Sequence, residues 1–146
     1  MTKRTTEVRF AVPADLAACS LYDYRGVAEY VIQHALQHRA VILAECEKDV
    51  VGYLRLEYLW SKLPYIALVW VREGDRRQGV GRSMLQFLEE ELRRNGHKLL
   101  LSSSQVNEPS PQAWHRAVGF KECGALSGIN EGGIGEVFFR KELDGQ

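Results

Sequence analysis

The chain has 146 residues, of which 45% are hydrophobic and 26% are charged, a composition typical of one ordinary globular domain spanning 1–146. Its 19 Lys and Arg residues balance its 19 Asp and Glu residues, so the formal net charge is zero. A nucleic-acid binder that neutralises phosphates normally has a basic excess, and no apolar run approaches the roughly 20 residues of a membrane span. We therefore expect neither nucleic acid nor a membrane as a partner.

The cysteines and histidines give no sign of a metal site. Cys19, Cys46 and Cys123 are scattered, without metal-ligand spacing, and are expected to be reduced. His34 and His38 lie four residues apart on a predicted helix, but no third ligand accompanies them. We therefore expect no bound metal. The first ten residues lack the apolar centre of a signal peptide, so we expect a cytoplasmic protein.

The first part of the chain has the pattern of a strand, two helices and a hairpin. Alternating residues predict strands, and Pro13 followed by Asp15 suits the first turn of a helix. The expected elements are a strand at 7–12, a helix from Pro13 to about Leu21, a helix at about 27–38, and strands at 40–46 and 50–60.

The remaining elements alternate between strands and helices. A turn at 61–64 leads into a buried strand, and Asn95-Gly96 ends the amphipathic helix that follows it. Strand, helix and strand in succession indicate a parallel pair. The expected elements are strands at 65–71 and 98–102, a polar loop at 102–111, a helix at 112–118, and an antiparallel pair at 120–126 and 134–141.

The most informative stretch runs from Leu68 to Leu92. A β-branched apolar run is followed by charged residues, then Gly79 and Gly81, then an amphipathic helix. Glycines let a backbone approach a ligand closely, and the first N–H groups of a helix, together with its dipole, favour an anion. Arg76, Arg77 and Arg82 add positive charge at this point, so a phosphate group is the expected ligand.

Two common phosphate-binding motifs fail here. The P-loop sequence is absent, and the third glycine of the dinucleotide-binding fingerprint is replaced by Met84. What fits is Arg76-x-x-Gly79-x-Gly81, which resembles the acetyl-CoA loop of the GNAT N-acetyltransferases. The Trp114–Phe120 segment and the final strand, 135–141, also resemble that family, as does the whole order of elements. The resemblance implies the GNAT acyl-CoA N-acyltransferase fold, an α/β (α+β) fold with a mixed, mostly antiparallel sheet flanked by helices.

The resemblance also implies roles for particular residues toward acetyl-CoA, the acyl donor. Asn107 would hydrogen-bond the cofactor arm, although the alignment there could shift to Glu108. One backbone N–H of the strand would polarise the thioester carbonyl. The strand residues that would pair with the pantetheine arm are Val69, Trp70 and Val71. The loop begins at Arg76, and the backbone N–H groups that would hold the pyrophosphate are those of Arg77, Gln78, Gly79, Val80, Gly81 and Arg82.

The acid and the base are less well marked. His115 occupies the position where family members often have a tyrosine that protonates the CoA thiolate, so it is either a general acid or a packing residue. Glu57 is a candidate base, but Arg55 is two residues away and would also pair with it. Water without a dedicated base is the other option.

The resulting hypothesis is an acetyl-CoA-dependent N-acetyltransferase in which a primary amine attacks the thioester directly. The alternative is a non-catalytic acyl-CoA-binding or sensor module of the same fold, and a third hypothesis is a nucleotide-binding protein unrelated to CoA. The acceptor amine is not readable, and a homodimer is possible because family members often dimerise. Aromatic residues that core packing explains equally well are available for the substrate side, namely Tyr22, Tyr24, Tyr30, Tyr58, Trp60 and Tyr65.

Overall fold

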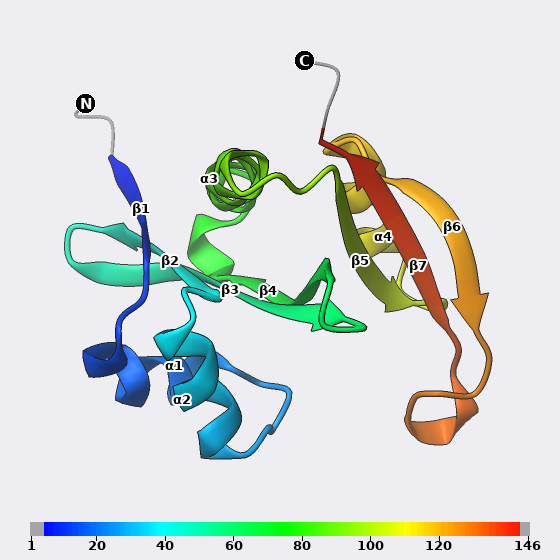
Figure 1. The fold of residues 1–146 in the computed structure, drawn as a ribbon, viewed down its shortest axis with the longest axis horizontal. Coiled ribbons are helices and arrows are strands. Elements are labelled where there is room, and N and C mark those ends of the chain that lie inside the picture. The colour runs from blue at the N-terminus through cyan, green and yellow to red at the C-terminus, as the bar shows by residue number, and fades with distance from the viewer. Residues whose placement is uncertain (1–4, 144–146) are drawn as a thin grey trace. The chain divides into compact units, whose positions relative to one another are not determined.

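Seven strands and four α-helices form the computed structural model of this chain, which describes residues 5–143 (Figure 1). The strands are β1 (Thr6–Phe10), β2 (Val41–Cys46), β3 (Asp49–Leu59), β4 (Leu63–Val71), β5 (Leu99–Gln105), β6 (Lys121–Leu126) and β7 (Glu136–Glu142). The helices are α1 (Leu16–Tyr22), α2 (Glu29–Gln37), α3 (Val80–Arg94) and α4 (Pro109–Ala117), with short 3-10 turns η1 (Pro13–Asp15), η2 (Glu73–Asp75) and η3 (Glu131–Gly133).

The sheet is mixed and mostly antiparallel, as predicted. Its strand order is β1-β2-β3-β4-β5-β7-β6. The pairs β1–β2, β2–β3, β5–β7 and β6–β7 are antiparallel, whereas β4 and β5 are parallel, with Tyr65 opposite Leu101. The predicted parallel pair on either side of α3 is therefore confirmed.

Two predicted boundaries, those of β5 and α4, differ most from the structure. The polar residues Ser102–Gln105 were expected in a loop, but they extend β5 along its whole ladder with β7. Their side chains alternate between the two sides of the sheet, and hydroxyl hydrogen bonds are made by the buried Ser102 and the half-buried Ser103. Helix α4 begins at Pro109 rather than at Gln112, because proline suits the first turn of a helix.

The chain divides into two compact units. The first contains residues 1–57 and 67–91, and the second contains residues 58–66 and 92–146. Strands β3 and β4 contribute residues to both units. The single domain spanning 1–146 stays a prediction.

In the first unit, helices cover both faces of strands β1–β3, with α1 and α2 on one face and α3 on the other (Figure 1). Successive side chains of a strand point to opposite faces, so Gly52 faces α3 whereas Tyr53 and Arg55 face the end of α1. A Cβ atom at Gly52 would lie only 2.8 Å from Met84 Cε and 3.0 Å from Val80 Cγ1. The close packing of α3 on the sheet therefore depends on Gly52, a glycine that the sequence did not single out.

In the second unit, α4 packs on one face of the β5–β7 pair. His115 on α4 contacts Ser102 of β5 and stacks on Phe139 of β7, which lie opposite each other in the ladder. Ser103 and Phe138, the next opposed pair, face the other side of these strands. The two faces thus carry different polar groups, and each is considered below.

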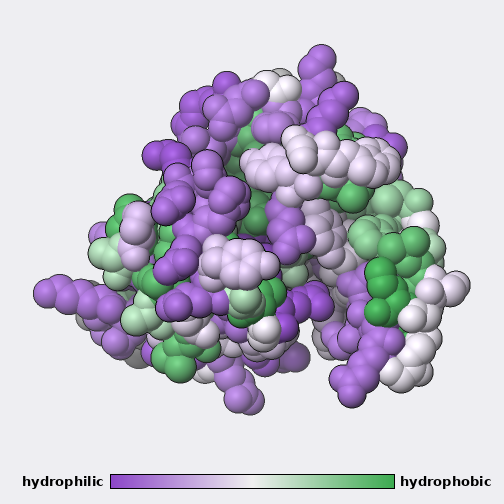
Figure 2. Space-filling view, turned by 60° about the horizontal axis from the view of Figure 1, so that its bottom comes forward, coloured by the Kyte–Doolittle hydropathy of each residue, from purple (hydrophilic) through white to green (hydrophobic). Residues whose placement is uncertain are grey.

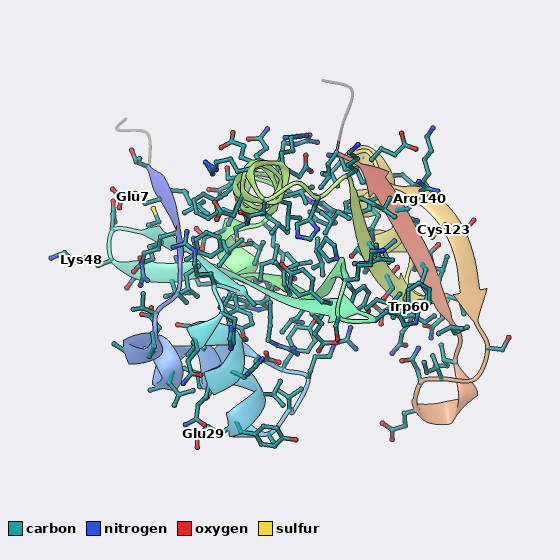
Figure 3. The ribbon with its side chains drawn as sticks, viewed as in Figure 1. Glu7, Glu29, Lys48, Trp60, Cys123 and Arg140 are labelled. Atoms are coloured by element: carbon teal, nitrogen blue, oxygen red, sulfur yellow. The ribbon has the colours of Figure 1, made fainter. Side chains whose placement is uncertain are left out.

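Exposed apolar side chains are dispersed over the described surface. Figure 2 shows several separate hydrophobic areas divided by hydrophilic ones on the face that it presents. The most exposed apolar residues are Trp60 (79%), at the turn after β3, and Leu21 (77%); Trp60 is labelled in Figure 3 together with the exposed, free Cys123 of β6. Among residues 5–143, no helix is long and apolar enough to cross a membrane.

Candidate functional site

The second half of β4 and the loop that follows it are held together by short-range hydrogen bonds. Arg72 N–H donates to the Val51 carbonyl at 2.8 Å, and the Arg72 Nε donates to Asp75 Oδ2 at 2.5 Å. Arg76 Nε donates to the Val71 carbonyl at 3.0 Å. The side chain of the first residue of the predicted motif therefore connects the loop to the last residue of β4. These contacts account for the burial of Asp75, which is 4% exposed within a charged segment.

The loop itself contains two residues in the left-handed region, Arg77 with a φ of 65° and Gly79 with a φ of 83°. A residue other than glycine in this region is strained by about 1–2 kcal/mol, so Arg77 is held there by its surroundings. A Cβ atom placed on Gly79 would meet no heavy atom within 4 Å. Tight packing therefore does not explain Gly79; its backbone conformation and the open space beside it do.

Helix α3 begins directly after Gly79. Its first intrahelical hydrogen bond is from Ser83 N–H to the Gly79 carbonyl at 2.9 Å. By the geometry of an α-helix, the amides before Ser83 have no carbonyl four residues back within the helix, and the helix dipole is positive at this end. Arg76, Arg77 and Arg82 are exposed here, and no acidic residue lies in the first turn. The start of α3 thus offers backbone donors and the positive end of the helix dipole, with three exposed arginines nearby in the chain, which suits an anion such as a pyrophosphate.

Val69, Trp70 and Val71 are half-buried at the end of β4. The Trp70 ring stacks on Tyr22 of α1, with ring centroids 4.8 Å apart and an angle of 21° between the planes. The last turn of α1 is thereby fixed against the strand that is predicted to bind the pantetheine arm.

Next to Tyr22 lies a buried cluster that sequence reasoning missed, formed by Asp23, Tyr53 and Arg55. Asp23 Oδ2 accepts hydrogen bonds from Arg55 Nε at 2.6 Å and from Tyr53 Oη at 2.8 Å. Burial, together with the hydrogen bond to Asp23, raises the pKa of Tyr53 well above its usual value, so this phenol stays a neutral donor. Burial alone would lower the pKa of Arg55, but its hydrogen bonds to Asp23 and Glu57 outweigh that effect and raise it.

Glu57, the candidate base, lies at the outer end of this cluster. Its side chain is 52% exposed, and its Oε2 accepts a hydrogen bond from Arg55 Nη1 at 2.8 Å. The pairing with Arg55 that the sequence suggested is therefore present. Because Arg55 is itself buried and bonded to Asp23, its hydrogen bond ties the Glu57 carboxylate to this cluster.

Asn107 belongs to the second unit, in the exposed turn between β5 and α4, as the sequence predicted. Gln112 Nε2 donates to the carbonyls of Gln105 and Val106, both at 3.1 Å, and so fixes the start of this turn. The role of Gln112 was not visible in the sequence, because its partners are backbone atoms.

His115 is buried in the same unit, with 2% of its surface exposed. Its Nδ1 lies 2.8 Å from the Pro111 carbonyl, which only accepts hydrogen bonds, so Nδ1 carries the hydrogen. Its Nε2 lies 2.7 Å from Ser102 Oγ and accepts the serine hydroxyl hydrogen. Burial lowers the pKa of His115 to about 4, and the hydrogen bond to Pro111 only partly opposes this. The neutral imidazole and its bonded nitrogens favour the packing role over the general-acid role.

We expect His115 to make the stability of the protein depend on pH. Its pKa is about 4 in the folded chain against 6.5 in the unfolded chain, so the unfolded chain takes up the proton first as the pH falls. At about 1.4 kcal/mol per pH unit, the free energy of unfolding should fall by about 3 kcal/mol more in the wild type than in His115→Gln between about pH 7 and about pH 4. Urea unfolding of both proteins across this range measures the difference, and parallel pH curves would contradict it.

Within the described part of the chain, no group of three or more His, Cys, Asp or Glu side chains is placed to hold a metal ion. His34 and His38 lie close together, with ring centroids 4.3 Å apart. Cys19 is buried, and burial raises the pKa of its thiol to about 12. A thiol with such a pKa is a poor nucleophile at neutral pH.

Comparison with known proteins agrees with the geometry of the strand, loop and helix. The model of the acetyltransferase (GNAT) family matches residues 10–120. A search of curated proteins gives no significant match. A solved structure of the ribosomal-protein-alanine N-acetyltransferase from Brucella melitensis is 26% identical, with a TM-score of 0.77 over 93% of this chain and 99% of that one.

Two further solved structures share the fold at lower identity. The ribosomal-protein-S18-alanine N-acetyltransferase from Escherichia coli is 15% identical, with a TM-score of 0.81 over 97% of this chain and 96% of that one. A putative acetyltransferase of Salmonella typhimurium, solved with acetyl-CoA, is 20% identical, with a TM-score of 0.78 over 97% of this chain and 95% of that one. Because the family model covers most of the chain, and the fold and the loop agree with it, this protein belongs to the GNAT acetyltransferase family.

Proposed function

We propose that this protein transfers an acetyl group from acetyl-CoA to a primary amine, which attacks the thioester directly. In this proposal the backbone groups of Val69, Trp70 and Val71 bind the pantetheine arm, and one of their N–H groups polarises the thioester carbonyl. The segment from Arg76 to Arg82, which comprises the loop and the first residues of α3, binds the pyrophosphate, and Asn107 hydrogen-bonds the arm. Acetyl-CoA supplies the activated acyl group, and the protein positions it.

The observation that carries this proposal is the loop before α3. Left-handed Arg77 and Gly79 turn the backbone, the space beside Gly79 is open, and exposed arginines lie at the positive end of α3. Donors that are fixed before the ligand arrives bind an anion without the cost of ordering them. These residues fit the pyrophosphate of acetyl-CoA.

The test begins with thermal unfolding in the presence of acetyl-CoA, ATP or NAD. A ligand at about 100 times its Kd stabilises the folded state by about 2.7 kcal/mol, which is easily measured. We expect stabilisation by acetyl-CoA alone. Stabilisation by ATP or NAD, but not by acetyl-CoA, would replace the proposal with the nucleotide-binding hypothesis.

Turnover is then measured as thiol release with a panel of amines. The Brucella melitensis relative is named for alanine of a ribosomal protein, so the panel includes a peptide with an N-terminal alanine beside polyamines and aromatic amines. We expect thiol release with at least one amine class, together with mass-spectrometric evidence of the acetylated product.

A non-catalytic acyl-CoA-binding module is the second candidate. The observation in its favour is His115, which is buried and uses both ring nitrogens in hydrogen bonds. Tight acetyl-CoA binding without thiol release on any amine would support it. His115→Gln separates the two roles of that residue, because loss of an acid lowers kcat without weakening acetyl-CoA binding.

A cytoplasmic location and a homodimer complete the proposal. Neither depends on the loop, and each has its own test. Sedimentation velocity over a range of protein concentrations measures the oligomeric state, and fractionation of cells measures the location.

A further inference from the structure

A chain of hydrogen bonds connects three side chains on one face of the second unit. Tyr65 Oη of β4 lies 2.6 Å from Ser103 Oγ of β5, and Ser103 Oγ donates to Glu136 Oε2 of β7 at 2.6 Å. Asn130 Nδ2 donates to the other carboxylate oxygen, Glu136 Oε1, at 2.9 Å. The Tyr65 ring also stacks on Phe138, with centroids 6.0 Å apart.

The direction of these hydrogen bonds follows from their chemistry. Ser103 has one hydroxyl hydrogen, which it donates to the carboxylate, so it accepts the hydrogen of Tyr65. The chain therefore runs from the phenol through the hydroxyl to the carboxylate. Tyrosine and serine each both donate and accept, so a proton that arrives at the Tyr65 oxygen can be passed on at each step.

Glu136 is 6% exposed, and the sequence analysis assigned it no role. A buried carboxylate is costly unless it is bonded, and Ser103 and Asn130 both donate to it. Tyr65 is connected to this carboxylate through Ser103, and the charge of Glu136 also acts on His115 of α4. The β5 strand end carries three serines and no carboxylate, so β7 supplies an acid that β5 lacks.

We propose that Tyr65, Ser103 and Glu136 form a proton relay that takes the proton of the acceptor ammonium, with Glu136 as the final base. This proposal rests on the proposed acetyl transfer, because that reaction is what requires an acceptor ammonium to lose its proton. The ammonium N–H bond breaks as a bond to the Tyr65 oxygen forms. The Tyr65 hydrogen passes to Ser103, and the Ser103 hydrogen passes to Glu136.

The products of this step are a neutral amine and a neutral Glu136, so charge and atoms balance. Acyl transfer from a thioester requires the neutral amine, which is what the relay provides. During acyl transfer the amine nitrogen loses one further proton and the CoA thiolate takes one. Glu136 then releases its proton to water by the reverse exchange along the chain. In this scheme Ser103 and Glu136 act through Tyr65.

The test uses the full chain, with acetyl-CoA affinity and amine turnover of the wild type measured first. If the wild type does not bind acetyl-CoA, the proposed function fails and the relay fails with it for that reason. With an active wild type, Glu136→Gln is expected to lower kcat by about 100-fold or more, with acetyl-CoA affinity within about twofold of the wild type. Glu136→Asp should restore part of the rate.

The pH profile distinguishes a relay from a structural carboxylate. In the wild type the relay removes the proton of the amine, so the rate should reach a plateau at a pH below that at which the free amine is deprotonated. The rate should lack this plateau and rise with pH until the free amine itself is deprotonated in the variants Glu136→Gln, Tyr65→Phe and Ser103→Ala. Glu142→Gln is the matched control, an exposed glutamate on the same strand, and should keep the wild-type profile. Glu57→Gln tests the competing base.

Two results would overturn the relay. One is a wild-type pH profile in both Tyr65→Phe and Ser103→Ala, which also decides the matter if Glu136→Gln does not fold. The other is a Glu57→Gln variant that loses the plateau while Glu136→Gln keeps the wild-type pH profile. That result would make Glu57 the base. Circular dichroism and thermal unfolding of each variant show which proteins are folded.

Discussion

Replacement of Gly79 by glutamate is expected to weaken acetyl-CoA binding by at least about 100-fold while the fold persists. Gly79 has a φ of 83°, and a Cβ atom there meets no heavy atom within 4 Å. The side chain therefore enters open space, and the fold has only the strain of a left-handed residue to absorb, about 1–2 kcal/mol. The carboxylate would occupy the space proposed for the pyrophosphate and repel it. Isothermal titration calorimetry with acetyl-CoA measures the loss.

Three control variants separate strain, bulk and charge. Gly79→Ala adds the strain almost alone and should cost less than about tenfold in affinity, because about 1.4 kcal/mol corresponds to tenfold. Gly79→Lys adds similar bulk with the opposite charge and should bind better than Gly79→Glu. Gly96→Glu is the matched control, with a φ of 85° and equally open space at the other end of α3. Unchanged affinity in Gly79→Glu would remove the pyrophosphate from this loop.

Removal of the Asp23 carboxylate should produce the largest loss of stability. The Asp23 side chain is 0% exposed and Arg55 is 2% exposed, with 2.6 Å between Asp23 Oδ2 and Arg55 Nε. Among residues 5–143, Asp23→Ala leaves the buried guanidinium with Glu57 as its one remaining carboxylate partner, which typically costs about 3–5 kcal/mol. It also removes the acceptor of the Tyr53 hydroxyl. Since a domain is stable by about 5–15 kcal/mol, urea unfolding should show a much lower midpoint.

Two comparisons show whether this loss comes from the unpaired charge. Glu142→Ala breaks an ion pair whose side chains are 46% and 72% exposed, and should cost less than about 1 kcal/mol. Asp23→Ala combined with Arg55→Met removes both charges and should be more stable than Asp23→Ala alone. Equal losses in the single and double variants would mean that packing, rather than the buried charge, holds the end of α1.

This cluster also connects stability to the proposed site. Tyr22, which stacks on Trp70, directly precedes Asp23, so the end of α1 contacts the strand that is proposed to bind the cofactor and is also bonded to β3. Arg55 in turn holds Glu57 through Nη1. The candidate base is thus hydrogen-bonded to a residue of the structural ion pair.

Much of the fold could be predicted from the sequence because its signals are local. Alternation predicted β1 and the hairpin, and apolar residues at helical spacing predicted α3 with its stop at Gly96. The boundary of β5 was wrong because serines look like loop residues until a neighbouring strand pairs with them, and that of α4 because a proline can also begin a helix. Glu136 lies opposite Gln105 in that pairing, and its partner Ser103 is 33 residues away in the chain.

The candidate site divides in the same way. The sequence by itself determined the family and the order of elements, and it predicted a cofactor site from Arg76 to Arg82, because a glycine pattern between a strand and a helix is a contiguous feature. Only the tertiary structure decided that Arg55 is buried against Asp23, 32 residues away, and that Tyr65 reaches Ser103, 38 residues away. The identity of a charged or hydroxyl residue does not show whether its side chain is solvated or buried. Its partners depend on strand register and helix packing, which no short stretch of sequence contains.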